Sequence, residues 1–425
     1  MALFAPGVAA EAAPGDAAGD SLPRPVGRSL PLPPTPQLPY DAKARPHPIP
    51  NDDWINVTAH SIDHVEFFVG DVYQASHYYC GTYGFQVVAE AGPLTGLAGA
   101  RSLVLAHGGV RLVLTSALHA DHAASRFVRR HGDGVRDVAL RSTDAVGDFE
   151  RAVAAGADAV AEPETFEDAD GRVTRATIAA TNDLVHTFVQ RDDPSGPFLP
   201  GRYRPIGDGV ASGPALLRSV DHLALCLRAG SLDTMVDFYQ RALGLRHTYD
   251  EYIVIGGQAM ASKVVQDETR GITFTMVEPD PVGDRGQLND FLDGFDGPGV
   301  QHVAYGTDDI VRAARELRDS GVELLSTPAG YYSSLADRGI EVDIDPAVLQ
   351  ELGLLADRDE WGQLVQVFTR SPYARRTVFF ELIQRLDART FGSGNIKALY
   401  EAVERERGTD PNAAVPVGAA ARAGA

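Results

Sequence analysis

The chain has 425 residues, and 58 Asp and Glu against 38 Lys and Arg give it a formal net charge of −20. This length suits two domains with tails rather than one compact core. A hydrophobic fraction of 44% excludes a chain that is disordered throughout. The acidic charge argues against nucleic acids and anionic membranes as partners, because phosphate groups are bound by clustered Lys and Arg.

Cysteine usage and hydropathy indicate the compartment. The two cysteines, Cys80 and Cys226, are too few for a disulfide framework or a structural zinc site. No run of 18 apolar residues could span a membrane, and the first 20 residues carry acids where a secretory signal has a basic region. We therefore expect a soluble, cytoplasmic protein.

The ends of the chain are low in complexity. Proline is concentrated in the first 50 residues, so residues 1–58 are predicted to form a disordered Pro/Ala-rich arm. Residues 409–425 are predicted to be a flexible tail.

The segments between these ends alternate between strand and helix patterns. Apolar residues recur at every second position in 219–227, which predicts a half-buried strand. Residues 231–243 open with a Ser/Asp cap signal and continue with helical spacing. Alternation returns in 271–279 and 363–369, and a second helix over 308–321 ends at a glycine. The pattern predicts an α+β fold of βαβββ modules.

The chain also repeats itself. The matched segments are 61–69 with 219–227, 77–86 with 237–246, 131–140 with 297–305, and 186–191 with 380–385. Ordered repetition indicates duplicated domains. We expect an N-terminal domain over 59–191, a Pro/Gly-rich linker over 192–216 and a C-terminal domain over 217–408.

Pairing the two copies shows which residues differ between them. The aligned pairs are His64 with His222, Asp137 with His302, and Thr187 with Glu381. The second copy alone offers two histidines and one carboxylate, which is the ligand set of non-haem Fe(II) sites. Bound Fe(II) with one carboxylate would leave a net positive site that attracts a 2-oxo acid anion.

Spacing alone supports this site only weakly, because about 80 residues separate one candidate ligand from the next. The alternative is that His222 and His302 are ordinary core histidines that only satisfy hydrogen bonds. However, Glu381 lies in the apolar segment VFFELI, and carboxylates are seldom buried without a partner. A cation would remove that cost.

Several motifs of the second copy resemble the 4-hydroxyphenylpyruvate dioxygenase family. They include GPGVQHVAYGTDDI (297–310), PAGYYSSLADR (328–338), TVFFELIQR (377–385) and FGSGNIKALYEAVERE (391–406). This is the two-domain branch of the vicinal-oxygen-chelate superfamily, and the resemblance spans roughly residues 59–408. It implies two tandem domains of paired βαβββ modules, of which the C-terminal one is an open barrel around the metal.

The resemblance also implies the chemistry. His222, His302 and Glu381 would hold Fe(II), the substrates would be a 2-oxo acid and O2, and the N-terminal copy would have no metal. A homodimer is expected on the same ground. Residues implied to contact the substrate are Ser262, Thr275, Val277, Gln287, Gln366, Phe368, Phe379, Ile396 and Tyr400.

The family contains two reactions of 4-hydroxyphenylpyruvate, and the sequence favours one of them. Ring-hydroxylating dioxygenases usually have Pro-x-Asn-Glu-Pro where this chain has Thr275-Met276-Val277-Glu278-Pro279, and Gly-Asn-Phe where it has Gly394-Asn395-Ile396. These departures resemble 4-hydroxymandelate synthases, which hydroxylate the benzylic carbon and release CO2. The alternatives are a dioxygenase that forms homogentisate and a non-catalytic binding protein of the same superfamily. Phenylpyruvate remains open as the substrate.

Overall fold

The computed structural model describes residues 57–207, 211, 213–255, 257–392 and 394–398, all of which belong to one compact unit, Asn51–Ala425. The expected tail over 409–425 lies outside the described residues, as does the expected arm except for its last two residues. Of these two, Thr58 donates from Oγ1 to the Asp148 carboxylate at 3.0 Å, so the arm's predicted end is bonded to the first domain.

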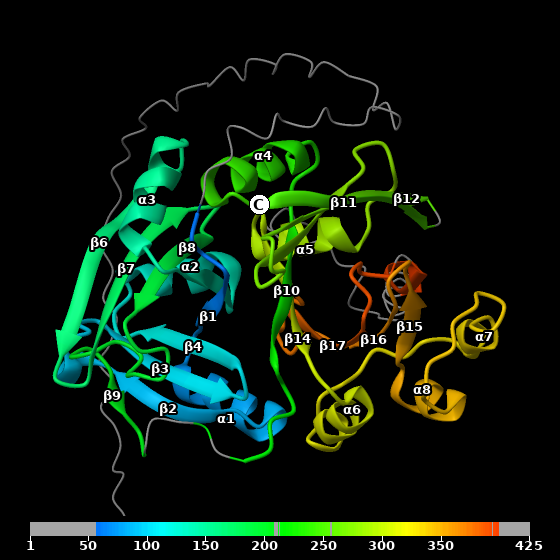
Figure 1. Cartoon of the computed structure of the whole chain (residues 1–425), viewed down its shortest axis with the longest axis horizontal. Helices are drawn as coiled ribbons and strands as arrows, with labels where there is room; N and C mark the ends of the chain where they lie inside the picture. Colours follow the sequence, from blue (N-terminus) through cyan, green and yellow to red (C-terminus); the bar gives the residue numbers. More distant parts are fainter. Residues whose placement is uncertain (1–56, 208–210, 212, 256, 393, 399–425) are drawn as a thin grey trace, which may run out of the picture. The chain divides into compact units, whose positions relative to one another are not determined.

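Two curled, mixed sheets form the fold, which is α+β as expected (Figure 1). The first has the order β6-β7-β8-β5-β1-β4-β3-β2-β9. Its strands are β1 (Ser61–Phe68), β2 (Gln86–Ala91), β3 (Ala100–His107), β4 (Val110–Ala117), β5 (Gly134–Arg141), β6 (Ala159–Asp168), β7 (Gly171–Ala179), β8 (Val185–Arg191) and β9 (Arg204–Pro205).

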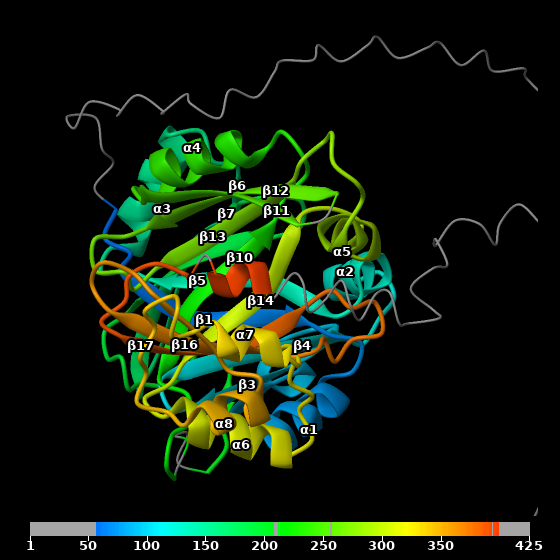
Figure 2. The same ribbon diagram turned by 90° about the vertical axis from the view of Figure 1, so that its right-hand side faces the viewer.

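The second sheet has the order β11-β12-β13-β10-β14-β17-β16-β15, and Figure 2 looks towards it. Its strands are β10 (Ser219–Cys226), β11 (Arg246–Ile255), β12 (Gln258–Gln266), β13 (Thr273–Pro279), β14 (Gly299–Gly306), β15 (Leu355–Arg358), β16 (Gln363–Phe368) and β17 (Phe379–Leu386). The central strand β14 is buried at all eight positions, which is typical of a strand covered on both faces.

The two sheets repeat one register, which confirms the predicted duplication. In the first sheet β1 pairs with β4 in parallel and with β5 antiparallel, and in the second β10 pairs in the same way with β13 and β14. His64 lies opposite Ala139, and His222 lies opposite Ala304. The aligned pairs of the two copies therefore occupy equivalent places in their sheets.

Helices connect the strands and cover the sheets. In the first copy they are α1 (Val72–Tyr83), the 3-10 turn η2 (Pro93–Thr95), α2 (Ala123–His131) and α3 (Ala145–Ala154). In the second they are α4 (Leu232–Leu243), α5 (Gln287–Phe295), α6 (Ile310–Asp319), α7 (Ala329–Ser333) and α8 (Pro346–Leu352).

The two predicted helices form as α4 and α6, but α4 is capped differently from the expectation. Ser231 occupies the N-cap position and its side chain makes no capping bond. Instead Glu278, from the end of β13, accepts from the backbone N–H groups of Ser231 and Leu232, both at 2.9 Å. A carboxylate at a helix N-terminus satisfies free donors there and interacts favourably with the helix dipole.

The start of the predicted linker belongs structurally to the first sheet. Arg204 and Pro205 form β9, which pairs with β2. Phe198 and Tyr203 stack edge to face at 4.8 Å and pack against the buried residues of the first sheet. This segment thus closes part of the first copy's concave face. Among the described residues, no helix has both the length and the apolar character needed to cross a bilayer.

Candidate metal centre and substrate pocket

Three neighbouring strands bring His222, His302 and Glu381 together. The register of β10, β14 and β17 places Ala224 opposite His302 and Ala304 opposite both His222 and Glu381. The Glu381 Oε2 atom lies 3.4 Å from the Nε2 atoms of both histidines. One ligand atom from each residue falls within 4.8 Å of the others, and in the described part of the chain no other His, Cys, Asp or Glu group does so.

The arrangement fits a cation better than a hydrogen-bonded core. Glu381 is 2% exposed, and its Oε1 atom has no hydrogen-bond partner among the described residues. The buried Nδ1 atom of His302 also lacks one. A buried carboxylate without full hydrogen bonding is costly unless a cation is present. Two imidazoles and one carboxylate on one side of an ion, with the other positions open, match the donor set of non-haem Fe(II) sites.

A second layer of charge holds His222 in place. Its Nδ1 atom lies 2.9 Å from Asp221 Oδ1, and the Arg385 guanidinium donates to both oxygens of that carboxylate at 2.8 Å. A carboxylate behind an imidazole fixes the tautomer that presents Nε2. Arg385 lies on β17, four residues after Glu381, so one strand supplies both a candidate ligand and this support.

The electrostatics of the group place a proton on one imidazole. Burial lowers the pKa of His222, but attraction to Glu381 and the hydrogen bond to Asp221 outweigh it and raise the pKa to about 9. Burial and repulsion from His222 hold the pKa of His302 well below its ordinary value. Burial raises the pKa of Glu381, although His222 opposes the change. A metal ion must therefore displace a proton from His222 in order to bind.

The three side chains line a hollow of about 620 Å³, part of which is open to solvent. The wall is mostly apolar, with a few polar side chains. The remaining lining residues are Ala224, Tyr249, Ile253, Met260, Ser262, Val264, Thr275, Val277, Gln301, Gln366, Phe368, Phe391 and Ile396.

Most of the predicted substrate contacts lie in this hollow. Those that line it are Ser262, Thr275, Val277, Gln366, Phe368 and Ile396. Phe379 is not among the lining residues, but it lies on the same face of β17 as Glu381, and its ring stacks on His302 with centroids 4.9 Å apart. Gln287, at the start of α5, is not among the lining residues, and Tyr400 lies outside the described residues. A direct role in substrate binding stays a prediction for all nine residues.

The residue Ile396 reaches the hollow because the segment before it is anchored. The Tyr331 hydroxyl accepts from the Ala356 N–H at 2.9 Å, and its single proton lies between two acceptors, Asn395 Oδ1 at 2.6 Å and the Ala356 carbonyl oxygen at 2.8 Å. The Gly394 N–H donates to Asp357 at 2.8 Å. Figure 2 shows the short helix over 394–398 in front of β10 and β14. The Tyr331 side chain of the PAGYYS segment thus supports Asn395, which directly precedes the lining residue Ile396.

Seven lining residues were not predicted from the sequence: Ala224, Tyr249, Ile253, Met260, Val264, Gln301 and Phe391. Tyr249 and Ile253 lie four apart on β11, a strand so rich in polar residues that its alternation is hidden. Gln301 precedes His302 directly, and Phe391 packs its ring edge against His222 with centroids 4.9 Å apart. Phe391 is the first residue of the FGSGN motif, so the sequence does contain a signal for this position.

Comparison with known proteins bears on this geometry. The model of the Glyoxalase/Bleomycin resistance protein/Dioxygenase superfamily matches residues 61–191 and again residues 219–367. The 4-hydroxyphenylpyruvate dioxygenase of Dictyostelium discoideum is 35% identical over 82% of this chain and 99% of its own length. The enzyme of that name from Danio rerio is 34% identical, over 83% and 92%. The chain belongs to the 4-hydroxyphenylpyruvate dioxygenase family.

A solved structure from this family also matches. It is a triply substituted variant of 4-hydroxymandelate synthase from Streptomyces coelicolor, with 43% identity, a TM-score of 0.76, and coverage of 82% of this chain and 99% of that one. The family membership confirms the predicted tandem vicinal-oxygen-chelate fold and makes the chain an oxidoreductase of the dioxygenase class.

Proposed function

We propose that this chain is an Fe(II)-dependent oxygenase that converts 4-hydroxyphenylpyruvate and O2 to 4-hydroxymandelate and CO2. The observation that carries the proposal is the position of Val277 and Ile396 on the wall of the hollow above His222, His302 and Glu381. With Thr275, which also lines the hollow, these are the three places where the sequence departs from the ring-hydroxylating pattern, and the departures resemble the synthases. The likeness to a solved 4-hydroxymandelate synthase at 43% identity supports the same choice.

His222, His302 and Glu381 would hold the iron. When bound, Fe(II) would supply a chelation site for the 2-oxo acid and the activation of O2. With neutral imidazoles and one carboxylate, the loaded site carries one net positive charge, which favours a 2-oxo carboxylate although the chain as a whole is acidic. The substrate itself supplies two electrons when it loses CO2, so no second 2-oxo acid is consumed.

The remaining residues would orient the ring and exclude water. Gln366, 2% exposed, and Ser262, 8% exposed, can form hydrogen bonds in a wall that is mostly apolar. Phe368 and Phe391 supply aromatic surface next to the histidines. Because benzylic and ring attack differ by a small displacement of the substrate, the shape of the wall at Val277 and Ile396 would decide the product.

Product analysis tests the proposal. Fe(II)-loaded protein is mixed anaerobically with 4-hydroxyphenylpyruvate, oxygen is admitted, and the products are separated against standards. Chromatography is needed because 4-hydroxymandelate and homogentisate are isomers of equal mass. The expected main product is 4-hydroxymandelate. Homogentisate as the main product would contradict the proposal, and binding without oxygen uptake would indicate a non-catalytic binding protein. A parallel assay with phenylpyruvate shows whether the ring hydroxyl is required.

The double variant Val277→Asn, Ile396→Phe examines the wall directly. It restores the amide and the phenyl group that ring-hydroxylating dioxygenases usually have at these places. We expect the homogentisate fraction to rise while iron binding is unchanged, since neither residue belongs to the proposed ligand set. Met260→Leu, a volume-conserving change in the same wall, is the matched control and should leave the product ratio as it was.

A further inference from the structure

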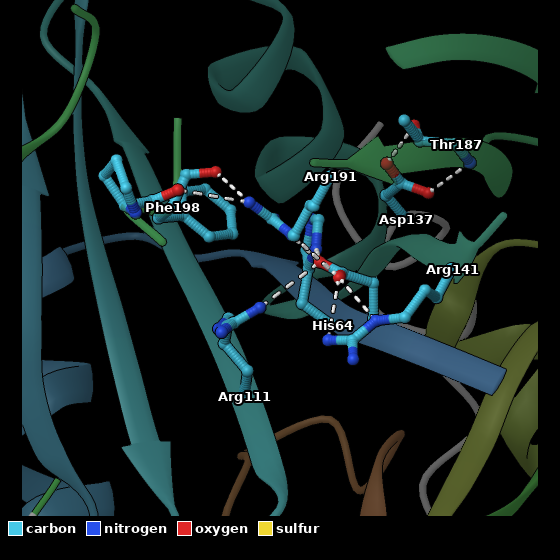
Figure 3. Close-up of polar contacts among 9 residues, drawn as sticks. His64, Arg111, Asp137, Arg141, Thr187, Arg191 and Phe198 are labelled. Carbon is cyan, nitrogen blue, oxygen red and sulfur yellow. Dashed lines mark hydrogen bonds and ion pairs between the residues drawn. The ribbon is translucent and has the colours of Figure 1, made fainter. Parts of the chain in front are cut away.

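The first sheet encloses a second hollow, of about 420 Å³, at the place that corresponds to the candidate metal centre. It shares no lining residue with the first hollow. Figure 3 shows five of its lining residues, His64, Asp137, Thr187, Arg191 and Phe198. The lining residues are His64, Glu66, Val113, Asp137, Val173, Arg175, Thr187, Val189, Arg191, Phe198, Leu199 and Tyr203.

One imidazole in this hollow is supported as firmly as His222 is in the other. The Nδ1 atom of His64 lies 2.8 Å from Asp63 Oδ1, and Arg191 binds both oxygens of that carboxylate, at 3.0 and 2.9 Å. Arg111 and Arg141 reach the same carboxylate, as Figure 3 shows. The support matches that of His222 by Asp221 and Arg385 in the second copy.

The supported imidazole is buried and aimed into the hollow. His64 is only 8% exposed, it lines the hollow, and no described residue makes a hydrogen bond to its Nε2 atom. In the second copy the equivalent nitrogen faces Glu381, but the equivalent residue here is Thr187. Both the N–H and the hydroxyl of Thr187 donate to Asp137. A polar atom that is held rigidly at the wall of a hollow, without a partner among the described residues, is available for a ligand contact.

Opposite charges line this hollow without pairing with each other. Glu66 accepts one hydrogen bond, from Thr115 at 2.6 Å, and no described cation lies within ion-pair distance of it. Arg175 packs over the ring of Phe166 and has no carboxylate partner among the described residues. Burial raises the pKa of the Tyr203 hydroxyl, Glu66 raises it further and Arg175 lowers it, which places both charges near that hydroxyl.

A metal ion does not explain these groups. His64, Glu66 and Asp137 are types that bind metals, but their ligand atoms do not converge within 4.8 Å, unlike those of the second copy. Nor is the hollow purely apolar, since its lining combines aliphatic and aromatic side chains with charged groups. The occupant should therefore be an organic molecule that carries both charges and an apolar body.

We propose that the hollow of the first sheet binds a zwitterionic α-amino acid with an apolar or aromatic side chain. The carboxylates of Glu66 and Asp137 would accept from its ammonium group. Arg175 would donate to its carboxylate, and the Nε2 atom of His64, unprotonated in the tautomer that donates from Nδ1 to Asp63, would accept from the ammonium group. Its side chain would pack against Phe198 and the neighbouring Val173, Val189 and Leu199. Charge-assisted hydrogen bonds at both ends would supply the selectivity.

Calorimetric titration with three related probes tests the proposal on the full chain. The probes are L-phenylalanine, phenethylamine, which lacks the carboxylate, and 3-phenylpropionate, which lacks the ammonium group. We expect phenylalanine to bind at least tenfold more tightly than either analogue. Equal binding of the amine and the amino acid, or no phenylalanine binding at millimolar concentration, would overturn the proposal.

Substitutions locate the binding to one copy. Glu66→Gln should weaken phenylalanine binding by about ten- to a hundredfold, because it removes one charged partner of the ammonium group. Arg175→Gln should weaken it by about three- to tenfold, since this guanidinium is exposed. Circular dichroism melting confirms that both variants are folded.

Glu381→Gln is the matched control, because it removes a carboxylate from the other hollow. It should leave phenylalanine binding unchanged. If Glu381→Gln abolishes binding and Glu66→Gln does not, the amino acid occupies the second copy and the proposal is wrong. The iron-dependent oxygen uptake of the Glu66→Gln variant is measured alongside, and we expect it to equal that of the unaltered chain. The proposal is independent of which product the second copy forms.

Discussion

Replacing Asp221 with asparagine tests whether the charge behind His222 governs the metal site. The carboxylate lies 2.9 Å from His222 Nδ1 and accepts two bonds from Arg385 at 2.8 Å. Asparagine keeps the shape but loses the charge and one acceptor. The chain contains its own matched control, because Asp63→Asn makes the same change next to His64 in the first copy.

The structure gives different magnitudes for folding and for metal binding. Removing one partner of a buried ion pair costs about 3–5 kcal/mol, because the other charge stays buried. Arg385 and Arg191 have side chains that are 19% and 3% exposed, so both variants should lose stability, and Asp63→Asn the more. At roughly 2–4 °C per kcal/mol for a domain of this size, the melting temperature should fall by roughly 6 °C or more in each variant.

Iron affinity should separate the two variants. Loss of the partner behind a metal-bound imidazole typically weakens binding about 10- to 100-fold, so Asp221→Asn should have this effect and Asp63→Asn none. Anaerobic equilibrium dialysis against Fe(II) at 4 °C measures the affinity, and circular dichroism at the same temperature gives the folded fraction for correction. Equal losses in the two variants, or normal affinity in Asp221→Asn, would refute the reasoning.

Three further predictions follow from the same geometry. His302→Ala should abolish iron retention and turnover, whereas Asp137→Asn, at the equivalent place of the first copy, should retain both. Metal analysis after gel filtration distinguishes the two variants. An iron-replete His302→Ala variant would disprove the ligand assignment. Fe(II) must displace a proton from His222, whose pKa is raised to about 9. The apparent affinity for Fe(II) should therefore rise up to tenfold per pH unit between pH 6.5 and 9 and level off above pH 9. An Fe(II) affinity that does not change with pH in anaerobic titrations would contradict this coupling. In the metal-free protein that proton stabilises the fold fully below pH 6.5, and the contribution disappears as pH rises to 9. Tyr373→Phe should lower the unfolding free energy by about 1 kcal/mol and leave turnover unchanged, because it removes the 2.6 Å hydrogen bond between the hydroxyls of Tyr79 and Tyr373. An unchanged free energy of urea unfolding would show that this hydrogen bond does not contribute to stability.

Sequence reasoning reached the site because the chain is duplicated. The repeat aligned His302 with Asp137 and Glu381 with Thr187, and the shared strand register shows that these alignments are spatial equivalences. The Asp–His dipeptide recurs at 63–64 and 221–222, and the Gln–Arg dipeptide at 190–191 and 384–385. The repeated Gln–Arg dipeptide is the sequence signal for the arginine that binds the aspartate next to each histidine.

By itself the sequence determined the α+β class, the duplication and the three candidate ligands, since these depend on local alternation and on comparison between copies. Only the tertiary structure decided which side chains line the hollow next to the three candidate metal ligands. Tyr249 and Phe391 come from segments far apart in the chain and reach one hollow only because sheet pairing brings β10 and β11 into one curve with the anchored helix over 394–398. It also decided that Glu278 caps a helix and that the predicted linker closes the first copy's hollow. Such contacts depend on packing between remote segments, which no local pattern records.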